Sequence, residues 1–136
     1  MNRHNPQRPP VRAILIGSAL LLVLSALSPA RAMERQSVEA DGIAAIQGSN
    51  LAQARDRAMT QALRGAIEKT IRSSVPPEAL AARQAVLDGK IYPSAERYIV
   101  HYRILREAEQ DGSYAVRIAA TVDVGVLRED LRRHGV

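Results

Sequence analysis

Two alternating apolar rows on either side of the dipeptide Asp111-Gly112 constrain the fold of this chain most strongly. The first row comprises Tyr98, Val100, Tyr102 and Ile104, and the second comprises Tyr114, Val116, Ile118, Ala120, Val122 and Val124. Alternation at every second residue is typical of a strand with one buried face. Asp-Gly is a typical hairpin turn. The sequence therefore predicts an antiparallel hairpin whose two rows share one buried face.

The two rows also predict the length of the hairpin loop. A two-residue loop would pair Gln110 with Ser113 and place the rows on opposite faces of the sheet. A three-residue loop pairs Glu109 with Ser113 and puts the rows on the same face. It pairs Ile104 with Ile118, Tyr102 with Ala120, and Val100 with Val122. We therefore predict the three-residue loop, a type I turn followed by a bulge with Gly112 in the left-handed conformation.

The strongest helical pattern runs from Asn50 to about Ser74. Its apolar residues recur every three or four positions in two stripes: Leu51, Ala54, Ala58, Ala62 and Ala66, and Met59, Leu63, Ile67 and Ile71. Asn50 and Gln53 form a capping box at the start, and the prolines after Val75 end the helix. The many alanines predict a helix that lies close against a sheet. Gly65 fits a close backbone approach or an unoptimised exposed position, and we favour the second.

Shorter patterns complete the fold. Residues 36–46 alternate as a strand, a candidate edge strand with Glu39 and Asp41 on its polar face. Residues 78–87 fit a short helix with Gly89 as its C-cap, and residues 126–133 fit an amphipathic helix capped by Gly135. The sequence thus predicts an α+β fold in β-α-β-β-α order. A small antiparallel sheet is crossed by one long helix, and a short helix follows at the C-terminus.

The first 32 residues have the pattern of a secretory signal peptide. A basic segment precedes an apolar run from Ala13 to Leu27, and Ala30-Arg31-Ala32 resembles a signal-peptidase site. A transmembrane anchor is the alternative, but a span needs about 20 apolar residues. We expect cleavage after Ala32, one domain over residues 33–136, location in the periplasm and no stable membrane anchor. No Cys follows the site to carry a lipid.

Charge and aromatic content argue against a nucleic-acid partner. The net charge is +5, yet four arginines lie within the first 32 residues. Without them, 15 basic residues face 14 acidic ones. Aromatic residues make up only 3% of the chain, too few for base stacking. We therefore expect no nucleic acid among its partners.

Residues that carry catalysis are scarce. There is no Cys, and His101 and His134 are the histidines after residue 32, both interpreted as exposed surface residues. The carboxylates are scattered, with no metal-ligand spacing and no phosphate-binding loop. We interpret Asp41-Gly42 as a bend in the first strand. The sequence predicts no catalytic residue, no metal and no cofactor.

Two groups of residues are candidate binding surfaces. Tyr98, Tyr102 and Tyr114 are expected on one hairpin face, as core residues whose hydroxyls reach its rim or as a ligand face. Glu39 and Asp41 are expected on an edge strand. Charges there discourage indiscriminate strand pairing while leaving room for a chosen partner, or they keep a monomer soluble.

Several segments together resemble the N-terminal domain of the flagellar assembly protein T family. They are Val38–Ile46 (VEADGIAAI), Asn50–Ala58 (NLAQARDRA), Ala62–Glu68 (ALRGAIE), Ile91-Tyr92, Tyr98–Leu105 (YIVHYRIL), Asp111–Val116 (DGSYAV) and Leu127–Leu131 (LREDL). The resemblance implies a periplasmic protein that associates with the flagellar basal body and helps to assemble its outer rings. It implies neither catalysis nor a cofactor.

Three functions are compatible with these features. The first is a non-enzymatic assembly or adaptor domain whose partners are flagellar basal-body or other envelope proteins, with homo-oligomerisation left open. The second is a binding domain for a small apolar or envelope ligand, through the tyrosine face. The third is an enzyme, which would need a cleft joining His101 to a carboxylate. We favour the first.

Overall fold

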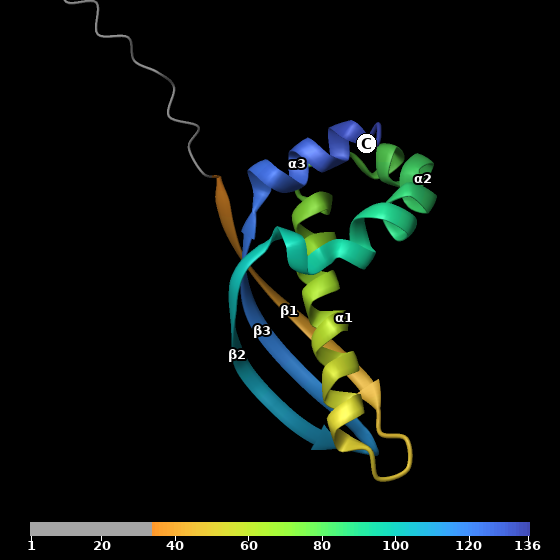
Figure 1. The fold of residues 1–136 in the computed structure, drawn as a ribbon, viewed down its shortest axis with the longest axis vertical. Helices are drawn as coiled ribbons and strands as arrows, with labels where there is room; N and C mark the ends of the chain where they lie inside the picture. Colours follow the sequence, from red (N-terminus) through yellow and green to blue (C-terminus); the bar gives the residue numbers. More distant parts are fainter. Residues whose placement is uncertain (1–33) are drawn as a thin grey trace, which may run out of the picture. The chain divides into compact units, whose positions relative to one another are not determined.

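The computed structural model describes residues 34–136, which form an α+β fold as the sequence predicts (Figure 1). The elements are β1 (Arg35–Ala45), α1 (Leu51–Arg72), α2 (Pro77–Val86), β2 (Ile99–Gln110), β3 (Ser113–Asp123) and α3 (Val124–Arg133). A π-helical turn and a 3-10 segment, residues 87–91 and 92–98, join α2 to β2. The predicted signal segment lies outside the described residues.

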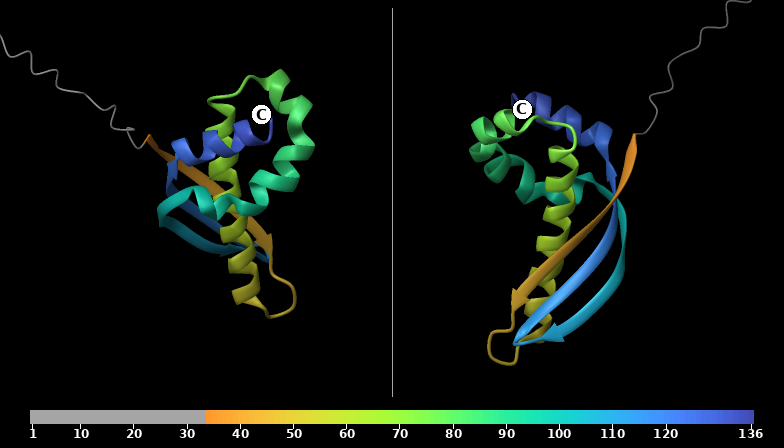
Figure 2. Two further views of the ribbon diagram at one scale, coloured as in Figure 1. Left: turned by 45° about the horizontal axis from the view of Figure 1, so that its top comes forward. Right: turned by 180° about the vertical axis from the view of Figure 1, so that it is seen from behind.

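The three strands form one antiparallel sheet in the order β1-β3-β2. The last strand in sequence is therefore central, and β1 and β2 are its two edges. Helix α1 packs across one face of the sheet, over β1 and β3, as both figures show. No helix of the described chain covers the other face (Figure 2, right). The prediction that β1 is an edge strand is confirmed.

The alanine stripe of α1 brings the helix backbone close to β1. Its members Ala54, Ala58, Ala62 and Ala66 are all fully buried. A Cβ at Gly42 of β1 would lie 1.9 Å from the carbonyl oxygen of Ala58, so only glycine fits there. The register of β1 is unbroken through Gly42, which therefore serves the helix contact and makes no bulge. At Gly65, a Cβ would make ordinary contact 3.7 Å from that of Ala40.

The predicted signals at the start of α1 and at the end of α3 are confirmed, except that the Asn50 amide donates to the carbonyl oxygen of Gln47, so the capping box is only half formed. The side chain of Asn50 accepts a hydrogen bond from the Gln53 amide at 3.0 Å. Helix α3 begins with Asp123, whose carboxylate accepts from the Val126 amide at 3.0 Å. Gly135 follows α3 with a φ of 73°, in the left-handed conformation that favours glycine.

A second part of the core lies at the end of the sheet where α2 and α3 meet α1 (Figure 1). The predicted short helix is present as α2, although none of its residues is buried. The prediction that Gly89 caps this helix is wrong, because helical winding continues through Gly89 as a π-helical turn. That turn carries Leu87 and Ile91 into the core, where both are fully buried beside Ile67.

The hairpin loop has two residues, and the three-residue prediction is wrong. Gln110 pairs with Ser113. Asp111 and Gly112 have φ values of 50° and 72°, so both are left-handed. This is the conformation of a type I′ turn, whose twist suits an antiparallel hairpin. Only the left-handed conformation of Gly112 was predicted correctly.

One bulge in β2 reconciles this turn with the apolar rows, and a second bulge ends the alignment near the start of the strand. An extra residue at Leu105 shifts the register, so that Ile104 pairs with Ile118 and Tyr102 with Ala120, as predicted. A second shift at Val100 leaves Ile99 opposite Val122, so the predicted pairing of Val100 with Val122 is wrong. The bulge at Leu105 returns Tyr102 and Ile104 to the face that the turn alone would deny them, whereas the bulge at Val100 puts Ile99 on that face in place of Val100.

The prediction that both rows are buried is half wrong. The row of β3 is buried against α1, but Val100, Tyr102 and Ile104 of β2 are 44%, 45% and 38% exposed. Tyr102 and Ile104, which oppose the buried residues Ala120 and Ile118, are hereafter the apolar row of β2. Helix α1 lies mainly over β1 and β3 and leaves these residues of β2 exposed.

The observed turn predicts the effect of substitutions at its two central residues. Gly112→Ala should destabilise the protein by about 1 kcal/mol or more, because alanine resists a positive φ. Asp111→Ala should now also be destabilising, since this residue is left-handed too, whereas Asp111→Gly should be tolerated. Urea denaturation of the three variants measures these differences. Wild-type stability in Asp111→Ala would contradict the type I′ turn.

Candidate partner-binding surfaces

The outer edge of β1 is closed by side chains of α1. Lys69 donates from Nζ to the carbonyl oxygen of Glu39 at 2.8 Å. The side-chain oxygen of Gln61 accepts from the amide of Ile43 at 2.8 Å. Arg57 donates to the carbonyl oxygen of Ala45 at 3.4 Å. Covering an edge in this way prevents strand pairing, so a partner strand would have to displace three side chains to bind here.

The outer edge of β2 has no such cover. Within residues 34–136, no side chain is hydrogen-bonded to the backbone of residues 99–110, and β3 is the strand that pairs with them. An edge strand of this kind presents a row of unpaired N–H and C=O groups. Proteins use such edges to bind an extended segment of another chain.

Both faces of β2 carry side chains that lack a partner. Tyr102 and Ile104 of its apolar row lie on the side of the sheet that α1 occupies, opposite the buried residues of β3. Arg103 and Arg106 pair with Ala119 and Arg117, which places them on the uncovered face. Neither Arg103 nor Arg106 forms an ion pair within the described part of the chain. Between Tyr102 and Arg106 the strand thus has an apolar side and a cationic side, both exposed.

Glu39 and Asp41 lie on the uncovered face of β1 with exposed side chains, where the sequence places them. Asp41 accepts a hydrogen bond from Arg117 of β3 at 2.6 Å. The carboxylates of Asp41 and, more weakly, Glu39 raise the pKa of the Arg117 guanidinium. Part of the acidic charge of this predicted partner surface is therefore balanced within the molecule.

The three tyrosines are not gathered around one cavity. Tyr98 lies before β2, in the 3-10 segment, and is buried. Tyr114 is buried in the part of the core that lies between the sheet and the alanine stripe of α1. Tyr102 is exposed in the apolar row of β2. Burial withdraws two of the three from the surface that a ligand would contact.

Helix α1 reaches β2 through one ion pair. Arg55 donates to Glu107 at 2.8 Å, near the turn end of the strand. This hydrogen bond, assisted by that of Tyr114, holds the pKa of the Glu107 carboxyl below its ordinary value. Glu107 therefore stays ionised and engaged with Arg55.

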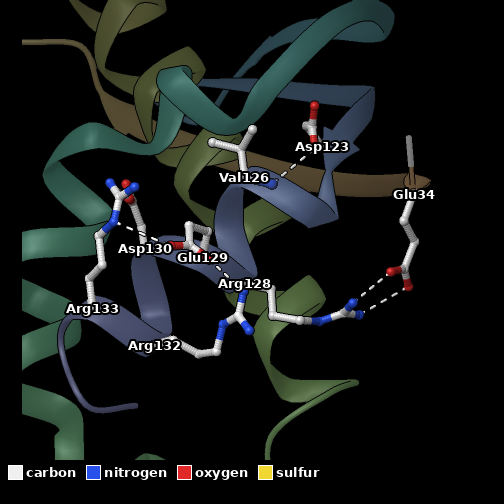
Figure 3. A network of polar contacts seen from close by, with 8 residues as sticks. All are labelled: Glu34, Asp123, Val126, Arg128, Glu129, Asp130, Arg132 and Arg133. Carbon is white, nitrogen blue, oxygen red and sulfur yellow. Dashed lines mark hydrogen bonds and ion pairs between the residues drawn. The ribbon is translucent and has the colours of Figure 1, made fainter. Parts of the chain in front are cut away.

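A depression of about 590 Å³ lies along α3. Figure 3 shows the charged side chains that line it. Its arginines are paired: Arg128 with Glu34, Arg132 with Glu129, and Arg97 and Arg133 with Asp130. Figure 3 shows Arg128 and Glu34 pointing toward one another. Because each of these cations already faces a carboxylate, the depression offers no unpaired charge to an anionic ligand.

Asp130 is the buried member of this network. Tyr98 donates its hydroxyl to the carboxylate at 3.0 Å, and Arg97 and Arg133 approach it to 3.4 and 3.2 Å. The sequence signals the contact to Arg133, three residues along the same helix. It gives no signal for Tyr98, because 32 residues separate the two. These contacts join α3 to the 3-10 segment, and loss of one partner would leave the buried carboxylate less compensated.

The raised pKa of Tyr98 predicts that the folded protein loses stability in alkali. Burial, with the hydrogen bond to Asp130, raises the pKa of Tyr98 to about 12, above the ordinary value of about 10. The unfolded chain therefore loses this proton first. The contribution of Tyr98 is complete below about pH 10 and is lost as the pH rises through about 12.

Urea midpoints at about pH 9 and about pH 11 measure this loss. The urea midpoint of Tyr98→Phe should fall less between the two pH values than that of the wild type. At about pH 9 the midpoint of the variant should already be lower, because Asp130 loses a hydrogen-bond donor. Tyr102→Phe, at an exposed tyrosine, is the control and should keep the wild-type difference. Equal losses in wild type and Tyr98→Phe would contradict the assignment.

The two histidines lie where the sequence places them. His101 is opposite Thr121, with 3.1 Å between its Nε2 and the threonine hydroxyl. His134 follows the last residue of α3, and both histidines are exposed. Across residues 34–136, no group of three or more histidine, aspartate or glutamate side chains is arranged to hold a metal ion. In the same range, no helix has the length and apolar character to cross a membrane.

No protein-family model matches the chain, and no curated protein matches it either. The resemblance to the flagellar assembly protein T family stays a prediction from the sequence. The candidate surface that the geometry defines is the outer edge of β2, with its free backbone groups, its apolar row and its two unpaired arginines.

Proposed function

We propose that this chain is a non-enzymatic assembly or adaptor domain of the periplasm, and that β2 is its working surface. The contrast between the two sheet edges carries this proposal. The β1 edge is closed by Lys69, Gln61 and Arg57, as expected of a protein that avoids unwanted pairing. The β2 edge lacks that protection and exposes its apolar row, which is typical of a surface that a partner covers.

The cellular setting of the proposal rests on the sequence. The signal-peptide pattern before Ala32 supports export to the periplasm. The resemblance of the strand and helix segments supports a role in assembling the rings of the flagellar basal body. Its partners are then basal-body proteins or other proteins of the cell envelope.

Deletion of the gene followed by complementation tests this function. We expect a motility or envelope defect that the wild-type gene restores. The double variant Arg103→Glu/Arg106→Glu should restore it poorly, since it reverses the charge of the β2 edge. Arg83→Glu/Lys90→Glu is the matched control, because it makes the same change in charge at exposed positions away from the sheet. No defect in the deletion strain would remove the proposed function.

The predicted acidic surface is tested in the same strain. Because the edge of β1 is closed, we expect Glu39→Arg/Asp41→Arg to restore function as well as the wild-type gene does. Poor restoration by this variant, with normal folding of the purified protein, would move the contact from β2 to the exposed face of β1.

A further inference from the structure

We propose that β2 binds an added strand from a partner protein, and that this strand alternates aliphatic and carboxylate side chains. The proposal rests on the proposed function and specifies the chemistry of the partner that an assembly domain of this kind recognises. Three properties of β2 carry it: a free backbone edge, an exposed apolar row on one side and unpaired arginines on the other.

The backbone of β2 provides the hydrogen-bonding part of the site. Residues 99–110 pair with β3 along one edge, and no other element of the described chain lies along the second edge. Addition of a strand there satisfies the outward N–H and C=O groups and extends the three-stranded sheet. A strand added at the opposite edge would have to displace Lys69, Gln61 and Arg57, which occupy three outward groups of β1.

The apolar row defines one side of the added strand. Tyr102 and Ile104 lie on the face of the sheet that α1 occupies, but their side chains remain exposed. Aliphatic side chains at alternate positions of a partner strand would lie beside them, at the spacing of cross-strand neighbours. Burial of this apolar area stabilises the complex. This side of β2 therefore selects an apolar row in the partner.

Charge complementarity defines the other side. Arg103 and Arg106 are three residues apart in sequence, but the bulge at Leu105 brings them into neighbouring positions on one face. Their β3 partners Ala119 and Arg117 are two residues apart, so the arginines are separated by one two-residue step. Carboxylates at positions i and i+2 of an added strand match that step.

The other charges near this face do not satisfy the two arginines. Asp41 is engaged with Arg117 across β3. Glu107 lies on the side of α1, where it is paired with Arg55. Glu109 also lies on the side of α1, since it pairs with Tyr114 next to the turn. Glu39 lies across Ala119 from Arg103 on the same face, but the two form no ion pair. A carboxylate that pairs with Arg103 or Arg106 therefore comes from outside the described chain.

A second copy of the chain does not supply this strand in its folded form. Residues 38–41 have the required alternation, Val-Glu-Ala-Asp, but β1 is paired with β3 on one edge and closed by α1 on the other. We therefore assign the acidic strand to a different protein. Self-association becomes an outcome of the test.

Two labelled peptides of about eight residues test the proposal with the full-length protein. One alternates valine with glutamate, and the other alternates valine with lysine. We expect saturable binding of the glutamate peptide by fluorescence anisotropy, at least about tenfold tighter than binding of the lysine peptide. Amide chemical shifts should move in β2 and not in β1. Arg103→Glu/Arg106→Glu should reverse the preference, whereas Arg83→Glu/Lys90→Glu should keep it.

Several results would overturn the proposal: no saturable binding of the glutamate peptide, equal affinity for both peptides, or shifts that map to β1. Sedimentation that shows a dimer formed through β2, and that excludes the peptide, would also overturn it in favour of a second copy. If the peptide does not bind but the deletion strain has a defect that the wild-type gene restores, the proposed function stands and the strand site does not. Peptide binding without any deletion defect would support the strand site and remove the proposed function.

Discussion

Replacing Ile67 with aspartate should unfold the protein or lower its melting temperature by more than about 10 °C. Ile67 is completely buried on α1, where it contacts the second part of the core together with Ile71 and Leu87. A carboxyl group there is either charged without a partner or protonated, at a cost of several kcal/mol. That cost is a large fraction of a total stability of about 5–15 kcal/mol.

Thermal melting followed by circular dichroism measures this effect. Thr60→Asp places the same carboxylate at an exposed position of the same helix and should change stability by less than about 0.5 kcal/mol. An Ile67→Asp variant that melts like the wild type would mean that this face of α1 is not buried.

Gly42→Ala should be the most destabilising single-methyl substitution in the sheet, costing about 3 kcal/mol. Its Cβ would lie 1.9 Å from the carbonyl oxygen of Ala58 and 2.7 Å from the amide nitrogen of Ala62. Both atoms belong to the helix backbone, so no side-chain rotation relieves the overlap. Helix α1 would have to move away from β1, which loosens the contacts of the alanine stripe.

Gly65→Ala is the matched control in the facing helix. Its Cβ would make only ordinary contact with Ala40, and alanine favours a helix over glycine by about 1 kcal/mol. Gly65→Ala should therefore be as stable as the wild type or more stable. Urea denaturation compares the two variants. Equal stability of Gly42→Ala and wild type would contradict the close approach of α1 to β1.

Local patterns in the sequence were sufficient to predict the strands and helices and several of their ends, but not the helical segment of residues 87–98. The period-two and helical repeats specify β1, α1 and the hairpin strands, because burial on one face imposes those periods directly. Asn50, Asp111-Gly112 and Gly135 mark a helix start, a turn and a helix end through their own backbone preferences. The α+β class and the edge position of β1 follow from these features.

The hairpin register was predictable only in part. The alignment of Ile104 with Ile118 and of Tyr102 with Ala120 is correct, yet the reason offered for it, a three-residue loop, is wrong. The chain instead forms the favoured two-residue turn and corrects the register with a bulge at Leu105. A bulge is a response to pairing along the whole strand, and no single residue of this sequence signals it.

The candidate site itself was decided by the tertiary structure. An alternating apolar row predicts burial, but it does not say whether a helix is available to cover it. An α-helix is about 10 Å wide and covers about two strands spaced 4.8 Å apart. The contact at Gly42 fixes α1 over β1 and β3, where Lys69 and Gln61 also reach the edge of β1. The third strand, β2, is consequently left with an uncovered apolar row and a free edge.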